Sequence, residues 1–450
     1  MVSSLAAEAN VIYPCSAVEP MFFSRSICFT VFCFVSGFAQ ADDWPQWRGT
    51  HRNAELSESE QVAKLPTKIV KRKWTAKIGS GYSGPSVANG RVYVTDRGEQ
   101  DTDDEVERVL CFDAKTGKPI WEHEYAAPYS IGYRAGPRAA VTIHDGMAYC
   151  VGAMGHFHCL NAEDGSVFWK RDLGKDYDVR MPIWGITASP LVYHDLVIQI
   201  AAGNGNACVV ALDAKTGKER WRALNERAGY SAPILIQQGE HDVVACWTGE
   251  SVSGLNPLDG SIYWSVPMLP RKMPIGVPTP IVKDDKLFVS SFYDGSMLIK
   301  LDQSRPAAEK VWHRIGVDEK NTDALHCMIS NPVFRGEHIY GVDSYGEFRC
   351  LKIDSGDRVW EDKSVVRRNR WATVYIIKNG NREIMLNENG DLISASLSPQ
   401  GFTEHSRAKF IAPTRKQLNR RGGVVWAHPA IANGHIFARN DNELVCASLR

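Results

Sequence analysis

The sequence predicts an all-β fold, an eight-bladed β-propeller of four-stranded antiparallel blades, from a repeated motif and from the two ends of the repeat. The motif is a small residue, Asp or Asn two positions later, Gly at six and Trp at ten, as in Ala211, Asp213, Gly217 and Trp221. Tryptophans at the last position or its equivalent recur every 43 to 52 residues, at Trp74, Trp121, Trp169, Trp221, Trp264, Trp312 and Trp360. Such periods, with several short strands in each, are typical of propeller blades.

Residues 1–41 are expected to be a misassigned start followed by a signal peptide. Met21 opens a short basic segment, residues 27–38 are apolar, and Ala39-Gln40-Ala41 has the small-x-small form of a cleavage site. The apolar run is too short for a stable membrane anchor. We therefore expect a periplasmic or secreted protein without a membrane span, mature from about residue 42.

Residues 42–70 are expected to form an irregular lead-in, and residues 71–450 a single propeller. The strand around Trp74 has no strands of its own unit before it, whereas the last unit, from Ala427 to Arg450, has three strands and lacks the fourth. Pairing the two completes the last blade and removes the exposed edges of an open array. The sequence thus predicts a ring that is closed by its N-terminal strand.

The units between these ends follow one pattern, with a Pro-led strand first and the Trp strand last. The seventh unit departs from it, because Trp371-Ala-Thr-Val replaces the Pro-led start and His405 replaces the tryptophan. Cysteines such as Cys111 and Cys159 occupy the small-residue position that Ala211 holds elsewhere. We expect them to be small buried residues rather than metal ligands.

The motif Ala/Cys-x-Asp-x-x-Thr-Gly-x-x-x-Trp resembles the tryptophan-docking motif of the pyrroloquinoline-quinone (PQQ) type repeat, over residues 71–450. That repeat occurs in quinoprotein alcohol dehydrogenases and in the propeller lipoprotein of the outer-membrane β-barrel assembly machinery. The opening Trp-Pro-Gln-Trp-Arg-Gly also looks like the PQQ-like propeller proteins of planctomycete-type bacteria. The resemblance implies that each tryptophan packs between blades. It implies a fold rather than an activity.

The resemblance to quinoproteins also implies a possible site, with PQQ at the channel mouth, Ca²⁺ held by carboxylate and amide oxygens, and a pair of adjacent cysteines. The sequence contains no adjacent cysteine pair and no haem-attachment motif. We therefore assign no catalytic residue, no metal ligand and no cofactor. The alternative is a PQQ- and calcium-dependent oxidoreductase that acts on alcohols or sugars.

The loops that join each Trp strand to the next unit should all reach one face of the ring and surround the mouth of its channel. They carry aromatic and basic residues, which are Tyr82, Arg134, Trp184, Tyr230, Trp371, Trp426, Arg367, Arg368, Arg370, Arg420 and Arg421. Arginine can bind anions in a bidentate manner, and aromatic rings supply stacking area. These residues form a candidate binding face; the alternative is a solvated, charged rim.

We predict an exported, non-catalytic propeller that acts as a binding or scaffold module through this face. The expected partner is a protein, or an anionic or carbohydrate ligand. Lys plus Arg and Asp plus Glu number 52 each, so the formal net charge is zero and nothing global favours nucleic acid. We expect a monomer.

Overall fold

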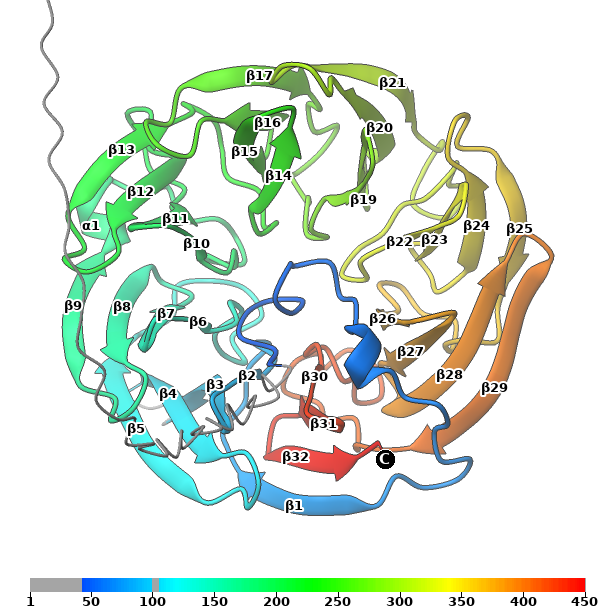
Figure 1. The fold of residues 1–450 in the computed structure, drawn as a ribbon, viewed down its shortest axis with the longest axis horizontal. Coiled ribbons are helices and arrows are strands. Elements are labelled where there is room, and N and C mark those ends of the chain that lie inside the picture. Colours follow the sequence, from blue (N-terminus) through cyan, green and yellow to red (C-terminus); the bar gives the residue numbers. More distant parts are fainter. Residues whose placement is uncertain (1–42, 99–104, 450) are drawn as a thin grey trace, which may run out of the picture. The chain divides into compact units, whose positions relative to one another are not determined.

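The computed structural model of the protein describes residues 43–98 and 105–449. The signal peptide and cleavage site expected between Met21 and Ala41 lie outside these residues. Within the described residues, eight four-stranded antiparallel sheets surround a central axis as the blades of a propeller (Figure 1). The predicted fold class is confirmed.

Each blade runs from an innermost to an outermost strand in chain order. Blades 1 to 4 contain β2 (Ser86–Ala88), β3 (Arg91–Gly98), β4 (Val106–Asp113) and β5 (Pro119–Ala126); β6 (Thr142–His144), β7 (Met147–Val151), β8 (His156–Asn161) and β9 (Val167–Asp172); β10 (Leu191–Tyr193), β11 (Leu196–Ile200), β12 (Val209–Asp213) and β13 (Glu219–Ala223); and β14 (Ile234–Gln238), β15 (His241–Trp247), β16 (Ser251–Leu255) and β17 (Ile262–Pro267). Blades 5 to 7 contain β18 (Ile281–Lys283), β19 (Lys286–Ser291), β20 (Gly295–Leu301) and β21 (Ala308–Arg314); β22 (Val333–Arg335), β23 (His338–Val342), β24 (Phe348–Lys352) and β25 (Arg358–Asp362); and β26 (Val374–Asn379), β27 (Arg382–Asn387), β28 (Asp391–Ser398) and β29 (Gly401–Lys409). Of the two short helical turns, η1 (Glu58–Glu60) precedes the first strand and α1 (Leu173–Asp176) follows β9.

The eighth blade joins the two ends of the described chain. It contains β30 (Ala430–Ala432), β31 (His435–Arg439) and β32 (Glu443–Ser448), and its outermost strand is β1 (Arg72–Lys77). In this antiparallel pair Trp74 lies opposite Cys446. The fully buried Arg439 also links the eighth blade to the first, because its guanidinium donates to the main-chain oxygens of Thr95 at 3.1 Å and of Gly79. The predicted closure by an N-terminal strand is confirmed.

The motif tryptophans lie between consecutive blades. The indole N–H of Trp169 in blade 2 donates to the main-chain oxygen of Ala214 in blade 3 at 2.9 Å. The ring covers Gly217, where an added Cβ would lie 2.6 Å from it. The small residue at the first position of the motif makes room for the tryptophan of its own blade. At Gly254, for example, an added Cβ would lie 2.3 Å from Trp264 on the neighbouring strand. A larger side chain at Gly217 or at Gly254 would therefore collide with an indole ring.

Two positions depart from this pattern. Trp264 donates to the side-chain oxygen of Gln238 at 2.7 Å instead of a carbonyl of blade 5, the blade whose outer hairpin is lengthened. In blade 7, His405 stands at a bulge of β29, and its ring bonds the hydroxyl of Ser396 at 2.7 Å. The seventh blade therefore carries a polar contact where the others carry a docked indole.

The hydrophobic core consists of layers between adjacent blades. Between blades 2 and 3, for example, Tyr149, Phe157 and Trp169 pack against Val197 and Val210. The described cysteines are all buried and free, in line with their reading as small apolar side chains. No helix among the described residues is long and apolar enough to cross a membrane.

Residues 43–70, called the plug segment below, cross one end of the central channel (Figure 1, blue). Main-chain bridges attach the segment to the ring at Trp44 with Val87 of blade 1 and at Glu55 with Lys378 of blade 7. Between these bridges, the guanidinium of Arg52 donates to the main-chain oxygens of Ser189, Pro190 and Pro233. The segment contains one short helical turn, η1, and closes one end of the channel.

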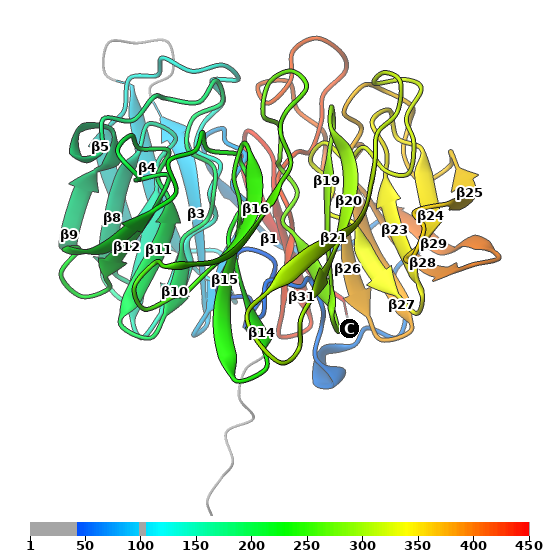
Figure 2. The same cartoon turned by 90° about the horizontal axis from the view of Figure 1, so that it is seen from above.

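The two faces of the ring differ. Figure 2 shows the plug segment on one face and the long loop between β29 and β30 on the other. The loops that connect consecutive blades gather on the second face, around the open end of the channel. This arrangement leaves one accessible mouth, which is where the candidate residues are found.

Candidate functional site

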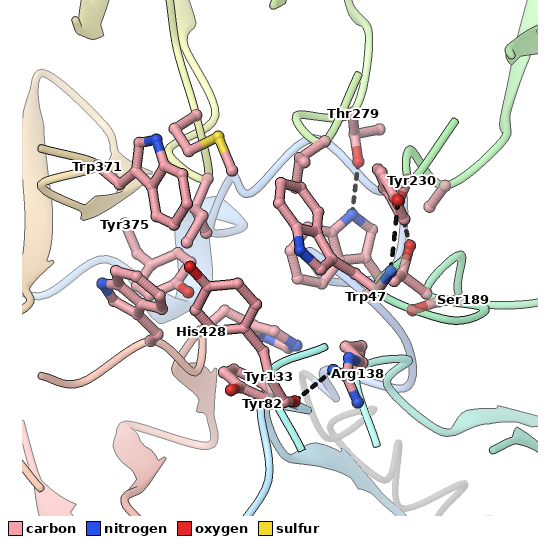
Figure 3. Close-up of a pocket in the computed structure, with 17 residues that line it drawn as sticks. Trp47, Tyr82, Tyr133, Arg138, Ser189, Tyr230, Thr279, Trp371, Tyr375 and His428 are labelled. Carbon is pink, nitrogen blue, oxygen red and sulfur yellow. Dashed lines mark hydrogen bonds between the residues drawn. The ribbon is translucent and has the colours of Figure 1, made fainter. Parts of the chain in front are cut away.

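The central channel contains a cavity that is lined by Trp47 of the plug segment and by residues of the interblade loops (Figure 3). Its volume is about 870 Å³, including the part open to solvent. The lining is largely aromatic and is formed by Trp47, Tyr82, Tyr133, Arg138, Trp184, Thr187, Ser189, Tyr230, Ala232, Val277, Thr279, Met328, Ile329, Trp371, Tyr375, Trp426 and His428. Each blade or interblade loop supplies at most a few of these residues. The cavity therefore forms only when the ring is closed and brings them together.

Aromatic rings of several interblade loops contact one another and line the cavity. The ring of Trp184 lies 4.9 Å from that of Tyr230 and 6.0 Å from that of Tyr133. The ring of Trp371 lies 5.9 Å from that of Tyr133 and 6.4 Å from that of Trp426. Tilted and edge-to-face pairs at these distances are favourable, and they fix the rings as a preformed surface.

The plug segment supplies the floor. The indole of Trp47 packs edge-on against the ring of His428 at 4.4 Å, and its N–H donates to the hydroxyl of Thr279 at 2.7 Å. Trp47 thereby connects blades 5 and 8 across the channel axis. The cavity is therefore a cup rather than a through-channel.

Two of the lining residues hold strained backbone conformations. Tyr133 has a φ of 56° and Trp371 a φ of 66°, and bulky side chains rarely adopt this left-handed region. The main-chain N–H of Trp371 donates to Ser344 at 2.8 Å, and Arg138 donates to the main-chain oxygens of Gly132 and Tyr133. Strain of this kind, on the order of 1–3 kcal/mol for each residue, is often found at functional sites.

Arginines lie over the rings at the mouth. The guanidinium of Arg370 lies 4.4 Å from the centre of the Trp371 ring, and that of Arg420 lies 5.2 Å from the same ring. Arg420 also lies 5.4 Å from the ring of Tyr133. The loops between blades 6 and 7 and between blades 7 and 8 thus meet at one indole, in cation–π geometry.

Four of the expected arginines are bound in ion pairs, three of them at the mouth. Arg370 pairs with Glu319 at 2.7 Å, Arg368 with Glu347 at 3.1 Å, and Arg421 with Glu388 at 2.8 Å. Burial raises the pKa of Glu388 to about 7, although Arg421 and the indole N–H of Trp426 oppose that rise. These ion pairs connect the arginine-bearing loops to neighbouring parts of the ring.

The remaining arginines fall into two groups. Arg367 and Arg420 are exposed and have no carboxylate partner among the described residues. Arg134 does not line the cavity and pairs with Glu105 at 2.8 Å. Of the expected residues, the cavity brings together Tyr82, Trp184, Tyr230, Trp371 and Trp426.

Sequence reasoning missed the floor and the paired acids. Trp47 of the plug segment and Tyr375 of β26 line the cavity but lie outside the interblade loops, and His428 lines it from the loop between β29 and β30 without being among the expected residues. The tryptophan-rich opening around Trp47 was a usable signal, since an irregular segment gains little from large rings unless they are buried. The acids Glu319, Glu347 and Glu388 gave no comparable signal, because their pairing depends on loop geometry.

The donor set of the cavity does not fit Ca²⁺ and PQQ. Calcium requires several oxygen ligands, usually with carboxylates among them, and none of the residues lining this cavity is Asp or Glu. Across residues 43–98 and 105–449, no group of three His, Cys, Asp or Glu side chains is placed to hold a metal ion. No reaction step can be derived through that cofactor from these residues.

The cavity does retain hydrogen-bonding capacity. The hydroxyl of Tyr133, the indole N–H of Trp371 and Nε2 of His428 have no hydrogen-bond partner among the described residues. Trp371 and His428 are 7% and 5% exposed. An apolar cup with a few such polar groups is suited to binding by stacking and shape.

His428 gives a testable pH dependence. Burial lowers its pKa to about 4, whereas the unfolded chain has a value near 6.5, so the unfolded chain binds the proton more tightly. The stability that depends on neutral His428 is complete above about pH 6.5 and is lost as the pH falls towards 4. His428→Phe should therefore reduce the difference in free energy of unfolding between pH 7 and pH 4.5 by about 2 kcal/mol.

Urea unfolding at the two pH values measures this difference. The matched control is His405→Phe on the exposed outer strand β29, which should keep the pH response of the unsubstituted protein. An unchanged pH response in His428→Phe would show that His428 does not contribute to acid sensitivity.

Comparison with known proteins identifies relatives by sequence. A family model described as outer membrane protein assembly factor BamB matches residues 105–362. The chain is 27% identical to that factor from Burkholderia pseudomallei over 229 residues, which are 48% of this chain and 52% of that protein. It is 25% identical to the factor from Yersinia pestis over 396 residues, which are 80% of this chain and 88% of that protein.

A solved structure shows the same fold with much lower identity. The quinohemoprotein alcohol dehydrogenase from Comamonas testosteroni superposes with a TM-score of 0.61 at 13% identity, over 91% of this chain and 80% of that one. At this identity the likeness concerns the fold alone.

Proposed function

The chain belongs to the family of the outer membrane protein assembly factor BamB, and we propose that it is an exported, non-catalytic scaffold. In this proposal it acts in outer membrane protein assembly and binds a partner protein through its aromatic mouth. The observation that carries the proposal is the family match over residues 105–362. A cavity lining without carboxylates agrees with a role in binding.

The composition of the mouth supports a protein partner. Tryptophan, tyrosine and arginine dominate the residues that contribute most energy to protein interfaces. Here Trp184, Tyr230 and Trp371 are held by mutual ring contacts, so little conformational entropy is lost when a partner binds them. Arg367 and Arg420 add exposed positive charge at the rim, which favours an acidic or carbonyl-rich surface.

The proposed location rests on the sequence between Met21 and Ala41 and on the family. A factor for outer membrane assembly must reach the far side of the inner membrane, and a cleaved signal peptide would take it there.

Deletion of the gene in the host bacterium tests the proposal. The amounts of folded outer membrane proteins should fall in the deletion strain, and a plasmid copy of the chain should restore them. Quantitative mass spectrometry of purified outer membranes provides the measurement. Unchanged outer membrane protein levels, with no defect to restore, would refute a role in assembly.

A further inference from the structure

A second cavity lies beside the plug segment. It is lined by Arg48, His51, Arg52 and Asn53 of that segment and by the innermost strands β14, β18 and β22, and its volume is about 870 Å³ including the open part. The channel cavity and this cavity share none of their lining residues. Nothing in the proposed assembly role uses the second cavity.

The two arginines of this cavity are equally buried but differ in their partners. Arg48 and Arg52 are each 4% exposed. Arg52 is surrounded by acceptors: its guanidinium donates to the side-chain oxygen of Gln46 at 2.8 Å and to three main-chain oxygens, including that of Pro233 at 2.9 Å. Its charge is thereby balanced by fixed dipoles, and Arg52 ties the plug segment to blades 3 and 4.

Arg48 lacks a comparable set of hydrogen-bond acceptors. Its Nη2 donates to the main-chain oxygen of Asn53 at 3.1 Å, whereas Nε and Nη1 have no hydrogen-bond partner among the described residues. No carboxylate within that part of the chain forms an ion pair with it. Burial lowers the pKa of Arg48 to about 10, so the group stays charged at neutral pH.

A buried charge without a counter-charge is unfavourable, and an anion is the direct remedy. The surroundings would attract one. His51 and Lys378 line the same cavity, while the only acid in its lining, Asp284, is exposed and pairs with Lys283 at 3.3 Å. Glu55, beside the cavity, is paired with Lys378 at 3.3 Å.

We propose that this cavity binds a phosphate group, with Arg48 as its principal ligand. A guanidinium provides several N–H donors in one plane, which suits the oxygens of a tetrahedral oxyanion better than a spherical halide. The group could come from free inorganic phosphate or from the headgroup of a phospholipid, because the recognised chemistry is the same. This site is independent of the mouth and of the proposed assembly role.

Thermal unfolding with increasing inorganic phosphate, at constant ionic strength adjusted with NaCl, tests the site. The Tm of the unsubstituted protein should rise with phosphate, because a ligand that binds only the folded state stabilises it. Arg48→Met should weaken phosphate binding roughly 30-fold or more. Its Tm without phosphate should not fall, since removing an uncompensated buried charge is often neutral or stabilising.

Arg52→Met is the matched control, at the same burial and in the same segment. It should lower the Tm without phosphate, because it leaves main-chain oxygens without their donor. Its phosphate-dependent rise should persist. If Arg52→Met does not fold, Arg52→Lys replaces it, with the same expectation for phosphate.

Two outcomes would overturn the proposal. One is the absence of a phosphate-dependent rise in the unsubstituted protein; another is a full rise in Arg48→Met. Co-sedimentation with phosphatidylglycerol vesicles distinguishes the two sources. If the protein binds the vesicles, if free phosphate displaces it from them, and if Arg48→Met abolishes this binding, the site recognises a lipid headgroup. A phosphate-dependent rise in Tm without vesicle binding would assign the site to free phosphate.

Discussion

A valine at Gly217 is expected to lower the free energy of unfolding by roughly 4 kcal/mol, the largest effect of any substitution considered. Gly217 has a φ of +67°, and a Cβ there would lie 2.6 Å from the indole of Trp169. A β-branched residue is strained in this conformation, and the ring cannot retreat while its N–H is bound to Ala214. Urea unfolding of the purified protein measures the loss.

Gly146→Val is the matched control for this prediction. Gly146 has a φ of +73° in another hairpin turn, and nothing lies within 4 Å of its added Cβ. Valine there should cost only the backbone strain, about 1–2 kcal/mol. Equal losses at Gly146 and Gly217 would contradict the idea that indole docking between blades makes the motif glycine necessary.

Replacement of Trp47 by alanine should lower the free energy of unfolding by about 3 kcal/mol and open the floor of the cup. The change removes the ring contact with His428 at 4.4 Å and the hydrogen bond to Thr279 at 2.7 Å. These contacts connect the plug segment to blades that lie far apart in the chain. Urea unfolding again provides the measurement.

Trp47→Phe separates the ring from its N–H group. It keeps an aromatic floor and loses the hydrogen bond, so the expected loss is about 1 kcal/mol. If Trp47→Ala were as stable as the unsubstituted protein, the plug segment would not be an integral part of the fold.

The sequence was sufficient to predict the architecture because each blade repeats its own packing rule. A small residue opposite each indole, as at Gly254 against Trp264, and a glycine under the indole of the preceding blade are local requirements that recur. The incomplete units at the two ends then specified the closure between β1 and β32. Both features can be recognised without any knowledge of long-range contacts.

The plug segment could not be predicted in the same way. Its arginines and tryptophans follow no strand period, and their partners are distant: Arg52 contacts Ser189 and Pro233, which are 137 and 181 positions away. Only the closed ring brings those carbonyls together. An irregular segment with several large side chains can equally be a surface loop, so its burial had to be observed.

The mouth was predictable in part for the same reason. Interblade loops must share a face, which places Trp184, Tyr230 and Trp371 around one opening. Whether an arginine in such a loop is exposed or paired depends on acids in neighbouring loops, as for Arg370 with Glu319, 51 positions away. The sequence therefore predicts which aromatic residues surround the opening, but not which of its arginines are paired with acids.

We propose that the mouth is the surface through which this propeller binds its partner. This proposal is tested most directly by complementation of the deletion strain with a chain that carries Trp184→Ala and Arg420→Ser. The matched control is Arg305→Ser, which replaces an exposed arginine in the outer hairpin of blade 5. With all chains present at equal folded levels, the mouth variant should fail to restore outer membrane protein levels, whereas the control should restore them fully. Full restoration by the mouth variant would contradict the proposal.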